Sequence, residues 1–182
     1  MGKPRIDKYN LNLAGEYRVA AELCLRGLFT SVTYGNKKGA DLYAIGENRK
    51  AAVIEVKASQ SNRFVTSLYQ KYKSEDMQAP DYWVLYSVKP SDTGFAERFF
   101  VLSHRELARI QGEVNCPGEK LSHEQIAARV SRGVDNVSLK HVESHENAWS
   151  KILEFLQISD RLIPKTRTTK HKTKELVKRK KS

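Results

Sequence analysis

The feature that most constrains the fold is an apolar run that ends in two charges, AAVIEVK at residues 51–57. Its short length and continuous apolar start predict a strand in the middle of a sheet, covered on both faces. Side chains alternate along a strand, so Glu55 and Lys57 point one way while Ile54 and Val56 point the other. Buried charges are costly unless they are paired or bind a metal, so this strand end is the first candidate for a functional site.

The pattern around this strand predicts a mixed α/β domain with one central sheet flanked by helices. Runs rich in β-branched and aromatic residues predict strands at residues 29–34, 40–45, 82–88 and 98–102. Apolar residues at helical spacing predict helices at about residues 13–27, 67–77, 104–110, 122–133 and 149–156, the first of them capped by Asn12. Residues 111–120 are expected to form a loop and residues 134–142 a sixth strand.

Asp41 stands at the start of the strand before residues 51–57, and a tight turn joins the two strands. In a hairpin the start of the first strand lies opposite the end of the second, so the Asp41 and Glu55 carboxylates would converge. Two carboxylates at one place repel each other, and a divalent cation that prefers oxygen ligands relieves the repulsion. The sequence therefore predicts a site for Mg²⁺, with Mn²⁺ as a substitute. Lys57 could there orient an attacking water or offset charge on the phosphorus.

Residues on either side of this hairpin could extend the site. Glu16 lies on the apolar face of its predicted helix, because apolar residues follow it at i+3, i+4 and i+7. An acid on an inward face is out of place unless it serves the site. The polar loop before Asp41 could contact a phosphate backbone through Tyr34, Lys37 and Lys38.

Asp41 followed by the triplet Glu55-Val56-Lys57 resembles the active-site motif of the PD-(D/E)xK nuclease superfamily, which has a restriction-endonuclease-like fold. The resemblance covers about residues 12–88 and includes the order of helix, hairpin and central strand. It implies that Asp41, Glu55 and the Val56 backbone carbonyl hold the metal, and that Lys57 assists the attacking water. The chain departs from the pattern at Ala40, where the family often has a proline that is not a ligand.

The resemblance also bears on Glu16 and Gln70. Glu16 looks like the additional acid of the archaeal Holliday-junction resolvase branch, which would hold a second metal or tune the first. Gln70 falls on the next predicted helix, where some branches place a polar residue near the site. The resemblance also makes a homodimer plausible, because two sites are needed to cut two strands.

The formal net charge is +11, and residues 165–182 carry +8 of it, with nine Lys or Arg and one acid. The sequence therefore divides into a domain at residues 1–164 and a basic tail at residues 165–182, which is expected to be disordered. Such a tail can hold DNA without reading its sequence, and the candidates for this are Lys165, Arg167, Lys170 and Lys172. A solvated tail that only aids solubility is the simpler interpretation.

The remaining signals concern compartment and thiol chemistry. No apolar run is long enough to span a membrane, and residues 1–10 lack a secretory signal, so we expect a cytoplasmic protein. Cys24 and Cys116 have no CxxC partner, which argues against a disulfide framework or a zinc site. Cys24 falls in an apolar helical pattern and is expected to be buried.

Together these features favour a Mg²⁺-dependent endodeoxyribonuclease, structure-specific or of restriction type, with DNA as its partner. The alternative is a nucleic-acid-binding protein that keeps the nuclease fold but no longer cuts. A third possibility is a basic-tailed interaction protein in which the motif is accidental. The structure of the DNA substrate and the choice between endonuclease and exonuclease action stay open, because one fold hosts many functions.

Overall fold

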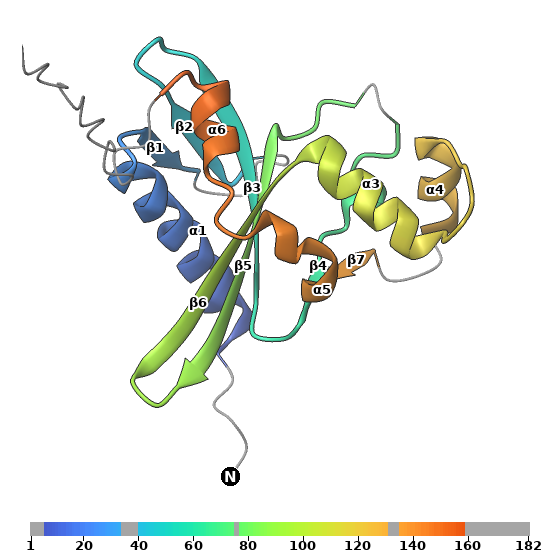
Figure 1. Cartoon of the computed structure of the whole chain (residues 1–182), viewed down its shortest axis with the longest axis horizontal. Helices are drawn as coiled ribbons and strands as arrows, with labels where there is room; N and C mark the ends of the chain where they lie inside the picture. The colour runs from blue at the N-terminus through green and yellow to red at the C-terminus, as the bar shows by residue number, and fades with distance from the viewer. Residues whose placement is uncertain (1–5, 34–39, 75–76, 131–134, 159–182) are drawn as a thin grey trace, which may run out of the picture.

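The computed structural model describes residues 6–33, 40–74, 77–130 and 135–158 (Figure 1). Its centre is a mixed five-stranded sheet in the order β1-β2-β3-β5-β6, in which β3 and β5 are parallel and the other neighbours antiparallel. Helices flank this sheet, so the predicted mixed α/β architecture is confirmed at this level. A separate two-stranded sheet pairs β4 with β7, and the sequence did not reveal it.

The elements have the following bounds. The central strands are β1 (Phe29–Val32), β2 (Leu42–Ile45), β3 (Ala51–Ser59), β5 (Tyr82–Ser91) and β6 (Gly94–Ser103), and the small sheet contains β4 (Arg63–Val65) and β7 (Asn136–Ser138). The helices are α1 (Lys8–Leu25), α2 (Leu68–Lys71), α3 (His104–Asn115), α4 (His123–Val130), α5 (Leu139–Val142) and α6 (Ser150–Phe155), with a 3₁₀ turn η1 (Glu143–His145).

Strand β3 lies in the middle of the sheet and is covered on both faces, as its apolar start predicts. The first core joins the sheet to α1 and α6, and its buried residues include Val19, Leu23, Ile54, Val56 and Ile152. The second core joins the opposite face to α2, α3 and α4, and includes Leu68, Trp83, Leu85, Phe100 and Leu107. Each such buried apolar side chain contributes roughly 1.5–3 kcal/mol. A charge on β3 therefore stands where an apolar residue would stabilise the fold more.

Helix α1 begins earlier than predicted, because Asp7 rather than Asn12 caps it. The Asp7 carboxylate accepts hydrogen bonds from the backbone N–H groups of Tyr9 and Asn10, which satisfies donors that the first turn leaves open. The apolar spacing also starts earlier than expected, since Leu11 is already part of the buried face. The predicted cap at Asn12 is therefore wrong.

Gly15 lets α1 approach the sheet closely. A Cβ atom at this position would lie 3.0 Å from the Ala58 Cβ and 3.2 Å from the Tyr86 ring, so a larger residue would push the helix away from β3 and β5. The next residue along the helix is Glu16. The close approach at Gly15 thus brings a carboxylate of α1 near the charged residues of β3.

Helix α2 is much shorter than the predicted helix over residues 67–77. It ends at Lys71, and Tyr72 leaves the helical conformation with φ −114° and ψ 79°. Tyr72 is buried, and its ring packs edge-on against Trp83 with 6.2 Å between the ring centroids. Burial of this ring in the second core therefore ends the helix before residue 77.

The C-terminal half also differs from the prediction at two places. Helix α3 continues to Asn115, through residues expected to form a loop, because Gln111 and Gly112 are buried and extend its inner face. The predicted strand over residues 134–142 is wrong after Ser138, where α5 begins. Leu139 and Val142 are both buried at i, i+3 spacing, which is the spacing of a helix and not of a strand.

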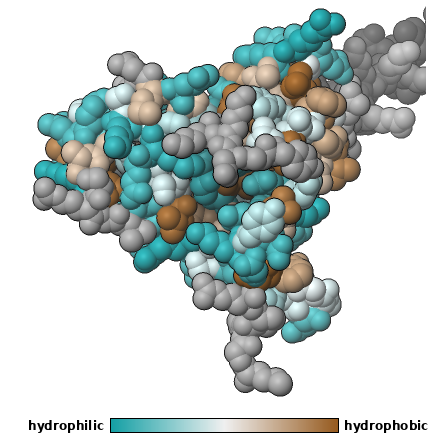
Figure 2. All heavy atoms as spheres, turned by 180° about the vertical axis from the view of Figure 1, so that it is seen from behind, coloured by the Kyte–Doolittle hydropathy of each residue, from teal (hydrophilic) through white to brown (hydrophobic). Residues whose placement is uncertain are grey.

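The surface carries isolated apolar groups. Figure 2 shows a largely hydrophilic face on which apolar residues form separate patches.

Cys24 is exposed, which corrects the expectation of burial, whereas Cys116 is buried. Across the described residues, no helix combines the length and the apolarity that a membrane span requires. The homodimer stays a prediction.

Candidate functional site

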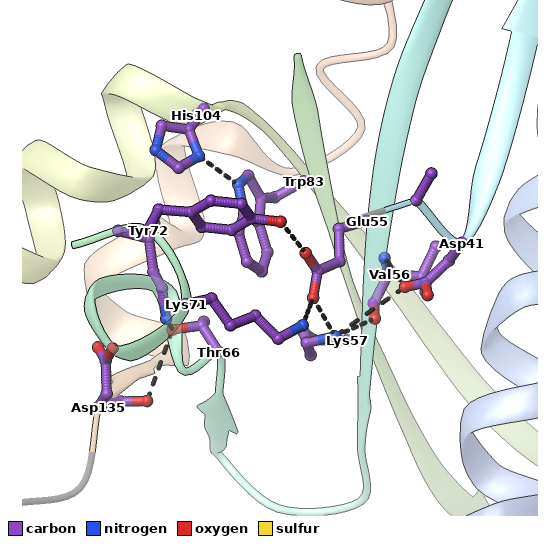
Figure 3. A network of polar contacts seen from close by, with 12 residues as sticks. Asp41, Glu55, Val56, Lys57, Thr66, Lys71, Tyr72, Trp83, His104 and Asp135 are labelled. Carbon is purple, nitrogen blue, oxygen red and sulfur yellow. Dashed lines mark hydrogen bonds and ion pairs between the residues drawn. The ribbon is translucent and has the colours of Figure 1, made fainter. Parts of the chain in front are cut away.

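Glu55, the middle residue of β3, is the centre of a cluster of charged side chains (Figure 3). Only 1 % of Glu55 is exposed, so its carboxylate is surrounded by protein. In the register of β2 and β3, Leu42 lies opposite Ile54, and the Asp41 N–H donates to the Ile54 carbonyl at 3.0 Å. Asp41 thus comes beside Glu55, as the hairpin geometry predicts.

Lys57 bridges the oxygen atoms that the sequence singled out. Its Nζ lies 2.7 Å from Glu55 Oε1, 3.1 Å from the Val56 carbonyl oxygen and 3.9 Å from Asp41 Oδ2. One ammonium group therefore contacts or approaches two carboxylates and one carbonyl. Asp41 Oδ2 also accepts a hydrogen bond from the Val56 N–H at 2.8 Å, which holds the Asp41 carboxylate against β3.

Two residues of the cluster were not predicted, Lys71 and Tyr72. The Lys71 ammonium forms an ion pair with Glu55 Oε1, and the Tyr72 hydroxyl donates to Glu55 Oε2 at 3.0 Å. The sequence suggested Gln70 of the same helix instead. Gln70 is exposed on α2. The sequence could have favoured Tyr72 instead, because the apolar residues Leu68 and Tyr72 are spaced i, i+4 and so mark the inward side of a helix.

An aromatic floor lies under the cluster. Trp83 is opposite Glu55 in the parallel register of β3 and β5, and its ring centroid lies 5.8 Å from Lys57 Nζ, within range of a cation–π contact. The Trp83 indole N–H donates to His104 Nδ1 at 3.1 Å. Burial lowers the pKa of His104 to about 4, so its ring is neutral at pH 7 and accepts this bond. A fully buried indole beside the carboxylate excludes water and strengthens the charge interactions above it.

Glu16 reaches this cluster from α1, on which it is half-buried. Burial raises the pKa of Glu16, repulsion by Asp41 raises it further, and the Lys57 ammonium opposes both. These interactions show that Glu16 is close enough to feel the charges of Asp41 and Lys57. The structure thus brings all four predicted central residues, Asp41, Glu55, Lys57 and Glu16, into one electrostatic neighbourhood.

The pKa values of the two hairpin carboxylates, Asp41 and Glu55, are shifted in opposite directions. Burial alone would raise the pKa of Glu55, but the ammonium groups of Lys57 and Lys71 outweigh it and hold the pKa below its ordinary value. Burial raises the pKa of Asp41, and the Glu55 charge adds to this, although Lys57 and the Val56 N–H act against it. Glu55 is therefore ionised at neutral pH, while Asp41 carries repulsion that an added cation would relieve.

The oxygen atoms around Lys57 have the chemistry expected of Mg²⁺ or Mn²⁺ ligands. Within the described residues, no three His, Cys, Asp or Glu side chains are grouped closely enough to bind an ion by themselves. The oxygen atoms that could hold a cation are instead those of two carboxylates, Asp41 and Glu55, and of the Val56 backbone carbonyl. A single positive group already lies within 3.9 Å of all three, so their convergence suits a cation.

Helix α2, which presents Lys71, is anchored by the buried carboxylate of Asp135. Asp135 Oδ2 accepts the backbone N–H groups of Tyr69 at 2.6 Å and Gln70 at 3.1 Å. The Gln111 side-chain amide of α3 donates to Asp135 Oδ1. Asp135 thus ties the first turn of α2 to α3 from the side away from Glu55, and it determines where Lys71 and Tyr72 stand.

Most of the predicted DNA contacts cannot be placed. Tyr34, Lys37, Lys38, Lys165, Arg167, Lys170 and Lys172 lie outside the described residues, and the proposed basic tail is among them. Comparisons with other proteins add nothing to the geometry: no protein-family model, no curated protein and no solved structure matches this chain.

Proposed function

We propose that this chain is a Mg²⁺-dependent endodeoxyribonuclease of the PD-(D/E)xK type, built on a restriction-endonuclease-like fold. The observation that carries the proposal is the position of Lys57, whose ammonium lies within 3.9 Å of oxygens from Glu55, Val56 and Asp41. An ion-pair network on a solvated surface would also join acids to a lysine, but here Glu55 is only 1 % exposed. A carboxylate on a central strand is rarely buried to this degree unless it is paired or binds a metal.

The supporting fold features concern the order of elements. A helix and an antiparallel hairpin that ends in the central strand β3 come first. The parallel pairing of β3 with β5 then places Trp83 and Leu85 beside Glu55 and Lys57. This order agrees with the resemblance drawn from the motif. Glu16, at the close approach of α1, supplies the extra acid that the resolvase-like branch of the superfamily would have.

In this proposal each residue has a separate role. Asp41, Glu55 and the Val56 carbonyl would hold Mg²⁺, which supplies Lewis acidity toward a phosphodiester when it is bound. Lys57 holds the attacking water by a hydrogen bond, or offsets the charge that develops on the phosphate oxygens. Tyr72 keeps Glu55 Oε2 in place, and since burial and the Glu55 charge raise the pKa of Tyr72, its hydroxyl stays protonated and donates.

DNA is the proposed substrate because of charge as well as motif. Residues 165–182 carry most of the net charge of +11, and a cationic segment increases affinity for a polyphosphate without selecting sequence. The cluster adds two lysines, Lys57 and Lys71, where a scissile phosphate would lie.

A non-cutting nucleic-acid-binding protein is the second candidate, and one observation favours it. Both oxygens of Glu55 already have protein partners, Lys57 and Lys71 on Oε1 and Tyr72 on Oε2. A carboxylate satisfied in this way is stable without a metal. Such a protein would bind DNA in a salt-sensitive manner and would be indifferent to the loss of Asp41.

Cleavage of supercoiled plasmid and of a branched oligonucleotide, with Mg²⁺, Mn²⁺ or EDTA, tests the proposal. Wild type should cut with either metal and not with EDTA, and Lys57→Ala should cut about 10²–10³-fold more slowly. The control is Lys140→Ala, an exposed lysine of α5. If wild type cuts none of the substrates with either metal, while wild type and Lys57→Ala both still bind DNA, the non-cutting protein would be favoured instead.

A further inference from the structure

Glu55 is paired with two ammonium groups that differ in how firmly they are held. Lys57 is 24 % exposed, lies on β3 itself, and also contacts the Val56 carbonyl. Lys71 is 45 % exposed and reaches Glu55 from α2, on the second-core side of the sheet (Figure 3). An ionised carboxylate has about four acceptor positions, and Lys57, Lys71 and Tyr72 take three of them. Oε1 accepts both ammonium groups, so a cation that binds this oxygen must displace one of them, and Lys71 is the more exposed of the two.

We propose that Lys71 is an exchangeable counter-cation of the site: it neutralises Glu55 when no metal is bound, and it moves to the DNA phosphate when a divalent cation takes its place. This inference rests on the proposed nuclease function. It assigns to Lys71 a role in binding the scissile phosphodiester, whereas Lys57 stays beside the attacking water.

The anchoring of α2 allows this exchange without a change of fold. Asp135 accepts the N–H groups of Tyr69 and Gln70 and thereby holds the backbone of α2, while Tyr72 is buried and bonded to Glu55 Oε2. The Lys71 backbone is thus fixed on both sides, but its long, half-exposed side chain can turn about four flexible carbon–carbon bonds. Only the ammonium group needs to move, and its reach keeps it at the mouth of the site.

The charge count of the cluster shows why the displaced ammonium should find a phosphate. With every group ionised, Glu16, Asp41 and Glu55 carry three negative charges against two positive charges from Lys57 and Lys71. This excess of one negative charge favours a divalent cation over an anion. Once the cation has bound, the same cluster has one excess positive charge, which complements a phosphodiester with its single negative charge.

Direct metal binding tests the exchange independently of cleavage. The full chain, without DNA, is titrated with Mn²⁺, and the free ion is followed by electron paramagnetic resonance. The variants are Lys71→Gln, Lys71→Arg, Glu55→Gln and the control Lys73→Gln, which removes an exposed lysine two positions away. Lys71→Gln should bind Mn²⁺ about five- to twenty-fold more tightly than wild type, because the competing charge is gone. Lys71→Arg and Lys73→Gln should resemble wild type, and Glu55→Gln should lose the site.

Binding of an oligonucleotide duplex, measured with Ca²⁺ to prevent cutting, gives the second half of the test. Lys71→Gln should weaken DNA binding about three- to ten-fold with Ca²⁺ and have less effect in EDTA, whereas Lys73→Gln should weaken both equally. Unchanged or weaker Mn²⁺ binding by Lys71→Gln would overturn the exchange while leaving the nuclease proposal intact. No Mn²⁺ binding by wild type, together with no cutting, would overturn both.

Discussion

Two carboxylates of this protein, Glu55 and Asp135, are equally buried, each with 1 % of its residue exposed, and they lie on either side of α2. Their partners are of opposite kinds. Glu55 faces two ammonium groups and a phenol, from Lys57, Lys71 and Tyr72. The hydrogen bonds to Asp135 come from neutral donors, namely two backbone N–H groups of α2 and the side-chain amide of Gln111, and the charge of His123 acts on it in addition.

This difference reverses the effect of burial on the two acids. Burial would raise both pKa values, but the lysines hold the pKa of Glu55 below its ordinary value. Burial raises the pKa of Asp135, and the N–H groups of Gln70 and Tyr69, together with His123, only partly oppose it. Neutral donors satisfy the geometry of a carboxylate without removing its charge. Asp135 thus positions a helix, whereas Glu55 stays ionised within a cluster of charged groups.

The largest effect is expected from Glu55→Gln, which keeps the shape of the side chain and removes its charge. DNA cleavage should fall by at least about 10³-fold, because the proposed metal site loses its most buried ligand. Initial rates of plasmid nicking at saturating Mg²⁺ would measure the loss, and circular dichroism would verify that the variant is folded. Cleavage within a few-fold of wild type would remove the functional half of the comparison.

Removal of the other carboxylate should act on stability. Asp135→Ala leaves the N–H groups of Tyr69 and Gln70 and the Gln111 amide without their acceptor, and should lower the free energy of unfolding by about 3 kcal/mol. Urea denaturation measures this change, and Asp92→Ala, at an exposed position between β5 and β6, is the matched control, with a change within about 0.5 kcal/mol. If Asp135→Ala were as stable as wild type and yet as inactive as Glu55→Gln, the division between anchor and site would be wrong.

The smallest effect is the pH dependence of stability, measured in EDTA, and it should have opposite signs for the two acids. The folded-state pKa of Glu55 is lowered, so its stabilisation is present above the unfolded value of 4.5 and is lost as the pH falls through the folded value. The folded-state pKa of Asp135 is raised, so the folded protein takes up this proton first and gains stability as the pH falls toward 3.8.

Urea titrations of wild type, Glu55→Gln and Asp135→Asn at several pH values separate these two contributions. The stability advantage of wild type over Glu55→Gln should shrink below pH 4.5, and that over Asp135→Asn should grow as the pH falls toward 3.8. Each unit of difference between folded and unfolded pKa contributes about 1.4 kcal/mol. If both stability differences changed in the same direction as the pH falls, the two carboxylates would not differ as described.

The central strand and the face of its charges were predictable from the sequence. The apolar run of β3 predicted its central place, and alternation along a strand placed Glu55 and Lys57 on one face. The tight turn before β3 placed Asp41 opposite Glu55, because a short hairpin leaves little freedom of register. These relations are local, since they depend on residues that are close in the chain.

The partners from distant segments were not predictable in this way. Lys71 and Tyr72 meet Glu55 only because α2 ends early, and α2 ends early because the Tyr72 ring is buried against Trp83 of another strand. The role of Asp135 depends on the pairing of β7 with β4, which carries it to the first turn of α2. Periodicity can indicate that Tyr72 faces inward, but it does not indicate which distant residue Tyr72 meets.

The sequence by itself thus determined the central strand, the acid pair and the lysine beside it, because backbone alternation and a tight turn act over short distances. Only the tertiary structure decided which further groups neutralise Glu55 and what holds them there. The physical reason is that burial of a charge requires partners, but does not specify the segment that provides them. Packing of α2 in the second core places Lys71 and Tyr72, and not the neighbouring Gln70, against Glu55.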